Sequence, residues 1–183
     1  MKRFRKFTAL LMAMVMVLAM GVTSFAAENT TYTIPVEYDS DFDGTADKTV
    51  YVTLNEDGSY VDSNGNSHKY TQSSGHSIEN YDKATAFDAL YATGLLDDYY
   101  AVEYLDTTTW QGTGVYGMAF NTFNGMSGGS VTDDETGVTT YTYWNLQIKE
   151  KNSDSYVSSD NYATHSLASD IDGVRVVFTS MEY

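Results

Sequence analysis

Short runs of alternating apolar and polar residues recur along this chain, and they constrain its fold more than any other feature. In the segment TYTIPVEY, Tyr32, Ile34 and Val36 share one face of an extended strand. The other predicted strands are 48–54, 100–105, 115–120, 140–149 and 174–178. An Asn64-Gly65 pair predicts a tight hairpin turn. Most of the fold is therefore expected to be sheet.

One segment has a helical period instead. In DKATAFDALYATG, Thr85 is suited to cap a helix, Asp88 three residues later favours the positive N-terminal end, and Gly94 ends it. The predicted apolar face consists of Ala86, Phe87, Ala89, Leu90 and Thr93. One helix against several strands predicts an α+β domain.

The first 26 residues have the features of a secretory signal peptide. A basic head, an apolar run over about 9–20 and the small residues before Ala27 predict cleavage after Ala26. A membrane anchor is the alternative, but this run is short for a span of roughly 20 residues. Residues 27–183 are then expected to form a single domain, without a membrane span or a C-terminal hydrophobic tail. The product is expected to be secreted, and held loosely at the cell surface at most.

Charge and cysteine content exclude several functions. The chain carries a net charge of −15, and four of its ten basic residues lie in the predicted signal peptide. Nucleic acid is therefore a poor partner, because phosphate binding needs clustered Lys and Arg, whereas cations are favoured. The chain has no cysteine, which excludes disulfides, thiolate metal sites and thiol nucleophiles. An exported protein without disulfides suits a bacterial source.

The segment YDSDFDGTAD is the candidate metal site. Its predicted calcium ligands, in the order of a calcium-binding loop, are Asp39, Asp41, Asp43, the carbonyl of Thr45 and Asp47. Gly44 would supply the sharp bend, but Val50 stands where such loops usually carry a bidentate Glu. Without that ligand, or flanking helices, the expected affinity falls in the weak class of roughly 10⁻⁴ to 10⁻³ M. The alternative is an acidic turn whose aspartates are merely solvated.

Aromatic residues supply the candidate ligand contacts, since exposed Tyr and Trp stack on rings and are favoured at interfaces. The candidates are Trp110, Tyr116, Tyr143 and Trp144. Trp144 lies on the apolar face of its predicted strand with Leu146 and Ile148, so a place in the core is the competing interpretation. Three histidines, His68, His76 and His165, lack the spacing of a zinc site and are expected in loops or on the surface.

Three segments resemble the transcobalamin and intrinsic-factor C-terminal domain family. They are Thr85 to Leu90, Tyr143-Trp144 with the strand to Lys149, and Asp172-Gly173 leading into Val174 to Phe178. The resemblance covers roughly 48–183. It implies a β-grasp (ubiquitin-like) mixed sheet packed on one helix. It also implies a relation to corrinoids, since cobalamin lies between this domain and a helical partner domain in animal carriers.

Two functions are expected from these features, and neither is enzymatic. The chain lacks a His-Glu-x-x-His motif and a phosphate-binding loop. The first expectation is a secreted domain that binds a small molecule or partner, with a relation to cobalamin. The second is a calcium-stabilised extracellular adhesion or interaction module for a protein or glycan.

Overall fold

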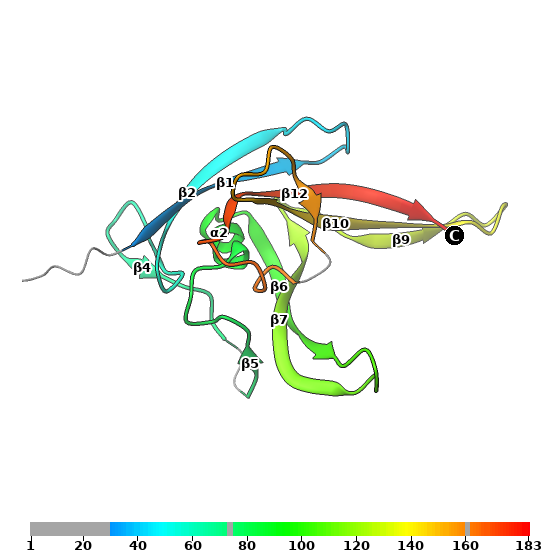
Figure 1. The fold of residues 1–183 in the computed structure, drawn as a ribbon. Coiled ribbons are helices and arrows are strands. Elements are labelled where there is room, and N and C mark those ends of the chain that lie inside the picture. The colour runs from blue at the N-terminus through cyan, green and yellow to red at the C-terminus, as the bar shows by residue number, and fades with distance from the viewer. Residues whose placement is uncertain (1–29, 73–74, 160–161) are drawn as a thin grey trace, which may run out of the picture.

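Strands dominate the computed structural model, which describes residues 30–72, 75–159 and 162–183 (Figure 1). The predicted signal peptide lies outside the described residues. The strands are β1 (Thr31–Asp39), β2 (Lys48–Asn55), β3 (Tyr60–Val61), β4 (Ser67–His68), β5 (Ser77–Ile78), β6 (Leu96–Leu105), β7 (Gly112–Phe123), β8 (Met126–Ser127), β9 (Gly129–Thr132), β10 (Thr139–Glu150), β11 (Val157–Ser158) and β12 (Ile171–Glu182). The one helix of the described residues is α2 (Ala86–Ala92).

The largest sheet has the strand order β11-β10-β12-β1-β2, and β9 pairs with β10 beside this path. Among the described strands of this sheet, only β1 and β12 run parallel to each other; they pair from Val36 and Val174 onward. Pro35 lacks a backbone donor, which favours an edge strand or an irregular start at this position. β1 is an inner strand, but the stretch through Pro35 pairs only with β2, because the pairing with β12 begins one residue later.

The predicted strand faces are confirmed where they form the core. Ile34 and Val36 of β1 are buried with Val52 and Leu54 of β2. Trp144 is also buried on the core side, so the core interpretation of this residue is confirmed. Alternation placed these side chains correctly because a strand turns successive residues to opposite faces.

A second sheet has the order β5-β7-β6, and the short strand β8 extends it beside β7. Its long ribbon, β6 with β7, contains three register irregularities. The predicted hairpin around Asn64-Gly65 is confirmed, since β3 pairs with β4 and Gly65 has a φ of 84°. Both structures follow from local turn chemistry and alternation.

The predicted helix boundaries are confirmed. Thr85 is the N-cap, and its hydroxyl accepts the Asp88 N–H while the Asp88 carboxylate accepts the Thr85 N–H, which completes a capping box. Gly94 follows the C-cap residue Thr93 with a φ of 69°.

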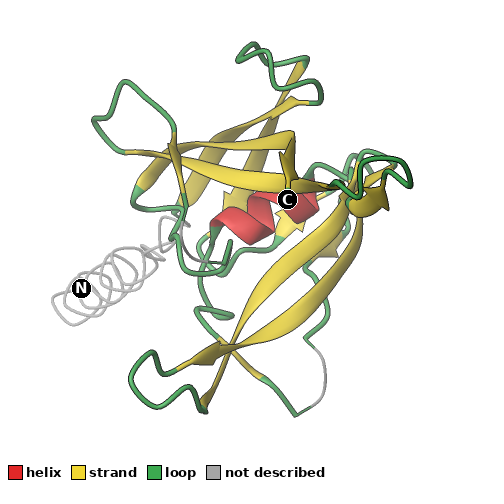
Figure 2. Ribbon diagram, turned by 90° about the vertical axis from the view of Figure 1, so that its right-hand side faces the viewer, coloured by secondary structure: helices red, strands yellow, loops and turns green. Residues whose placement is uncertain are grey.

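The predicted fold class, an α+β β-grasp sheet packed on one helix, is wrong. The described residues are mostly strand, and the large sheet curls into a half-barrel (Figure 2). The physical reason is length: α2 has seven residues, about two turns, whereas β7, β10 and β12 have 12 residues each. Such a helix is too short to cover the sheet, so its buried face joins a core made mainly by strands.

Candidate functional site

The candidate metal loop connects β1 to β2 at one end of the large sheet. Asp39 is the last residue of β1, and the chain re-enters the sheet at Lys48. Two residues within the loop, Phe42 and Gly44, have positive φ values of 59° and 85°. Gly44 adopts this conformation without steric cost, and the two left-handed residues fold the loop back over the end of β1.

Asp39 organises the loop from beneath. Its side chain is only 1% exposed. One carboxylate oxygen accepts the Phe42 N–H at 2.8 Å, and the other accepts the Gly44 N–H at 3.0 Å. Hydrogen bonds of this kind offset the cost of removing a carboxylate from water. The burial of Asp39 therefore depends on the loop conformation.

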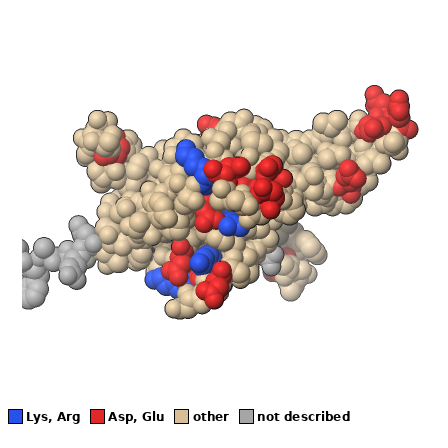
Figure 3. Space-filling model, turned by 90° about the horizontal axis from the view of Figure 1, so that it is seen from above, with Lys and Arg blue, Asp and Glu red and all other residues tan. Residues whose placement is uncertain are grey.

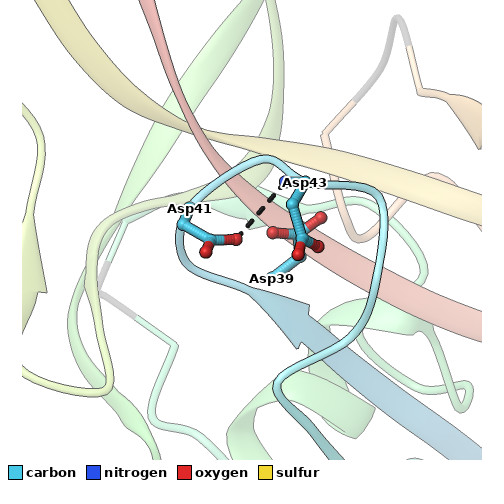
Figure 4. A group of neighbouring side chains, drawn as sticks. All are labelled: Asp39, Asp41 and Asp43. Carbon is cyan, nitrogen blue, oxygen red and sulfur yellow. Dashed lines mark hydrogen bonds between the residues drawn. The ribbon is translucent and has the colours of Figure 1, made fainter.

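Asp41 and Asp43 complete a group of three carboxylates. One oxygen from each of Asp39, Asp41 and Asp43 can be chosen so that all lie within 4.8 Å of one another. The three side chains point toward one another (Figure 4). Asp41 accepts the Asp43 N–H at 3.3 Å, and Asp43 accepts the Thr45 N–H at 2.7 Å. No Lys, Arg or His within the described ranges forms an ion pair with any of the three.

Asp47 and Thr45 are placed differently from these three. Asp47 accepts the Ser40 hydroxyl at 2.5 Å and the Ser40 N–H at 2.7 Å. The hydroxyl bond, and then the N–H bond, lower the pKa of Asp47 below its usual value. Asp47 thus closes the base of the loop, while the Thr45 N–H serves Asp43. Val50, at the twelfth place, is a strand residue paired with Val36.

Calcium needs six to eight oxygen ligands, and a carboxylate offers about four lone-pair directions. The loop's own hydrogen bonds use only some of these directions, so three carboxylates remain available for a cation together with carbonyls and water. The same hydrogen bonds also stabilise the loop by themselves. The geometry therefore suits both a weak calcium site and a self-capped acidic turn.

Trp110 and Tyr116 lie on the β6–β7 ribbon, which also approaches β5. Trp110 is at the tip of the hairpin, where it is 74% exposed and has a φ of 57°. Tyr116 pairs with Ile78 of β5, and its ring lies 4.2 Å from the ring of His76. Of these two, only Trp110 is exposed.

Tyr143 and Trp144 lie on β10 and line a depression of about 210 Å³ together with Phe120 and Tyr162. The indole N–H of Trp144 donates to the Met126 carbonyl at 2.9 Å, which fixes the ring in the core. Tyr143, on the opposite face, is 38% exposed. Neither Trp110 nor Tyr116 lines this depression. The four predicted aromatic contacts therefore do not form one pocket.

Two polar clusters were not predicted from the sequence. Asp88, besides capping α2, lies 3.7 Å from the ammonium of Lys69, and burial raises its pKa to about 6. Its Oδ1 atom is buried and accepts no hydrogen bond within the described part of the chain. The capping residue could be identified from the sequence, but no local pattern indicates that Lys69, 19 residues earlier in the chain, lies beside Asp88.

The second unpredicted cluster joins Glu79, Tyr104 and His165. The Tyr104 hydroxyl donates to Glu79 at 2.5 Å, and His165 Nδ1 lies 3.3 Å from both oxygens of Glu79. Burial, then the bond to Glu79, raise the pKa of Tyr104. His165 also lines a depression of about 500 Å³ with Ser166. These residues lie far apart in sequence, so no motif could have revealed them. His165 is exposed, as expected.

None of the helices in the described ranges is both long enough and apolar enough to cross a membrane. The chain matches no protein-family model, no curated protein and no solved structure. The resemblance to the transcobalamin C-terminal domain family therefore stays a prediction, and the β-grasp fold that it implied is wrong.

Proposed function

We propose that this chain is a non-enzymatic interaction module that works outside the cell, with calcium bound in the loop between β1 and β2. The observation that carries this proposal is the group of three carboxylates within 4.8 Å of one another, without a basic partner in the described residues. Like charges at such separations repel, and a divalent cation relieves that repulsion. The ion would brace the loop against the end of the sheet.

The shape of the aromatic region favours a macromolecular partner over a small ring-shaped ligand. Small-molecule pockets typically enclose about 300–1,000 Å³. The depression beside Tyr143 and Trp144 has about 210 Å³, and Trp110 lies at a separate hairpin tip. Corrinoid binding, which the resemblance implied, therefore has less support than binding to a protein or glycan surface.

A small polar ligand is the second candidate, and one observation favours it. The depression of about 500 Å³ beside His165 falls within the usual size range for ligand pockets. Its lining combines the charged residues Lys151, Glu150 and Asp170 with serines and with the apolar residues Ile148, Val157, Leu167 and Ile171. It lacks the aromatic side chains that stack on sugars or corrin rings.

The charge distribution is consistent with binding cations and with an extracellular polymer as partner. Figure 3 shows Asp and Glu side chains across one face and gathered at a projecting end, with fewer Lys and Arg among them. The net charge of −15 disfavours nucleic acid and anionic membrane surfaces.

The calcium proposal is tested by thermal melting of residues 27–183 in EDTA and in 10 mM calcium. With a dissociation constant in the weak extracellular range, mass action should stabilise the fold by about 1.5–3 kcal/mol. The double variant Asp41→Asn/Asp43→Asn should lose this stabilisation while retaining acceptors for the loop's hydrogen bonds.

The acidic turn between β9 and β10 supplies a matched control. Asp133→Asn/Asp134→Asn removes the same charge. Asp133 accepts two backbone N–H groups, the same number that Asp41 and Asp43 accept between them. This control should keep the full calcium response. Identical melting curves with and without calcium, or equal responses of the two double variants, would contradict a specific site.

A further inference from the structure

Strand β2 forms one edge of the large sheet. It pairs only with β1, over eight consecutive residue pairs from Thr31↔Asn55 to Tyr38↔Lys48, without a register irregularity. In Figure 1 it lies at the outer margin of the sheet. Tyr51, at the middle of the strand, is 71% exposed. A long regular edge leaves a row of unpaired backbone groups.

The direction of these backbone groups follows from one hydrogen bond. Asn55 pairs with Thr31 on one side, and its N–H donates to the Ser59 carbonyl at 2.8 Å in the turn that follows β2. That N–H points away from β1. Because backbone groups alternate along a strand, the N–H and C=O of Thr53, Tyr51 and Thr49 also point away from β1.

The other edges of the two main sheets are protected, but β2 is not. The β6 edge carries Asp97, Asp98 and Glu103, and its pairing with β7 contains three irregularities. At the opposite margin of the large sheet, β11 and β9 have only two and four residues. Charges, irregularities and short length are the usual protections against strand addition. Over Thr49–Thr53, β2 carries no charge and no register irregularity; Lys48 precedes this stretch, and the chain that returns from Asn55 to β3 lies beside its last residues.

We propose that β2 accepts an extended segment of a partner polypeptide, which adds to the sheet as a strand and carries basic residues at both ends. The unpaired groups of Thr49, Tyr51 and Thr53 would hold the segment through main-chain hydrogen bonds. The basic ends follow from charge complementarity: the four aspartates of the loop at one end of β2 remain net negative even with one divalent cation bound, and Glu56 with Asp57 flanks the other end. This inference deepens the proposed interaction function and rests on it.

A second copy of this chain is the competing occupant. Two β2 strands could pair around a two-fold axis, but each copy carries a net charge of −15, which opposes self-association. A basic segment from another protein is attracted by the same charge. The two occupants therefore differ in their expected salt dependence.

The test uses a fluorescently labelled, capped peptide of sequence KKTVTVTVKK and measures its binding to residues 27–183 by anisotropy. Tyr51→Pro removes one outward donor without removing a donor to β1, and it should weaken binding at least tenfold. Tyr51→Ala keeps that donor and should bind within about threefold of wild type. Raising sodium chloride from 50 to 300 mM should weaken binding severalfold by screening.

If the Tyr51→Pro variant fails to fold, a second measurement on the wild-type protein tests the inference instead. The amides of Thr49 and Tyr51 in the wild-type protein should exchange with deuterium more slowly once the peptide is added. Unchanged exchange, or equal affinity of folded Tyr51→Pro and wild type, overturns the inference. A dimer in sedimentation experiments without peptide, abolished by Tyr51→Pro, also overturns it by making a second copy the occupant.

The peptide assay is repeated in EDTA and in 10 mM calcium. Peptide binding together with identical melting curves in EDTA and in calcium leaves the β2 inference standing while the calcium proposal fails. A calcium-dependent melting shift without peptide binding supports the calcium proposal and overturns the β2 inference.

Discussion

Asp39 and Asp88 are both buried carboxylates, 1% and 2% exposed, yet the fold satisfies them in different ways. Asp39 uses both oxygens to accept N–H groups from residues three and five positions later. Asp88 uses a single oxygen for the Thr85 N–H and hydroxyl. Its other oxygen accepts no hydrogen bond among the described residues and lies 3.7 Å from Lys69.

The difference shows where each carboxylate obtains its stabilisation. The stabilisation of Asp39 comes from its own loop. With the two further aspartates beside it, Asp39 forms a group of three carboxylates that could hold a cation. Asp88 depends on distant parts of the chain, since Gly58 packs against its carboxyl group and Lys69 approaches it. Changes at Asp39 should therefore act locally, whereas changes around Asp88 should affect the whole fold.

The largest effect is expected from Gly58→Ala. An added Cβ would lie 2.6 Å from Asp88 Cγ, and Gly58 has a φ of 82°. Steric overlap with a buried group and a strained left-handed residue should together cost about 2–5 kcal/mol in the free energy of unfolding. Urea denaturation measures this cost.

Gly65→Ala is the matched control. Gly65 has a nearly identical φ of 84°, but an added Cβ there would contact nothing within 4 Å. Its cost should be the backbone strain alone, about 1–2 kcal/mol. Equal losses in the two variants would show that the contact between Gly58 and Asp88 is unimportant.

The second-largest effect is expected in the pH dependence of the free energy of unfolding, to which Asp88 contributes. Its pKa is raised by burial to about 6, above the unfolded value of about 3.9. The folded state thus binds the proton more tightly, and this stabilisation is complete below pH 4 and lost as the pH rises to about 6. Asp88→Asn should remove that dependence, worth about 3 kcal/mol across the window.

Comparison with wild type isolates the contribution, because other carboxylates titrate in both proteins. Asp134→Asn, on an exposed turn, removes one charge without affecting a buried group and serves as the charge-matched control. If wild type and Asp88→Asn lose stability in parallel between pH 4 and 6, the carboxyl of Asp88 is not protonated preferentially in the folded state.

The same contrast explains how much of the fold could be predicted from the sequence. The faces of β1 and β2, the Asn64-Gly65 hairpin and the N-cap of α2 at Thr85 all depend on neighbours within a few residues, and all were predicted correctly. The β-grasp fold was wrong because the strand order and the curl of the sheet depend on long-range pairing.

The candidate site divides in the same manner. The spacing of Asp39, Asp41 and Asp43 correctly indicated that these carboxylates come together, because the connecting loop is short. The turn of Asp47 toward Ser40 followed from the loop's detailed conformation, which spacing does not determine. Glu79 and His165 meet only in the folded chain, 86 residues apart, so the sequence offered no signal for them.

The third effect is expected from Asp39→Ala. This change leaves the N–H groups of Phe42 and Gly44 without their acceptor beneath the loop. The loss should be about 1–3 kcal/mol, because two part-buried hydrogen bonds to a charged acceptor are removed. Calorimetric melting in EDTA measures it apart from any metal effect. A loss below about 0.5 kcal/mol would show that the loop reorganises and water replaces the carboxylate.

The smallest effect is expected from Asp41→Asn in EDTA. Asp41 is exposed, and an asparagine carbonyl can still accept the Asp43 N–H, so only a charge is removed. The free energy of unfolding should change by less than about 0.5 kcal/mol, and any change should be an increase because repulsion among the three carboxylates falls. In 10 mM calcium the sign should reverse, since the variant has lost a ligand. A variant less stable than wild type in both buffers would assign Asp41 a structural role in the loop, and the contrast with Asp39 would disappear.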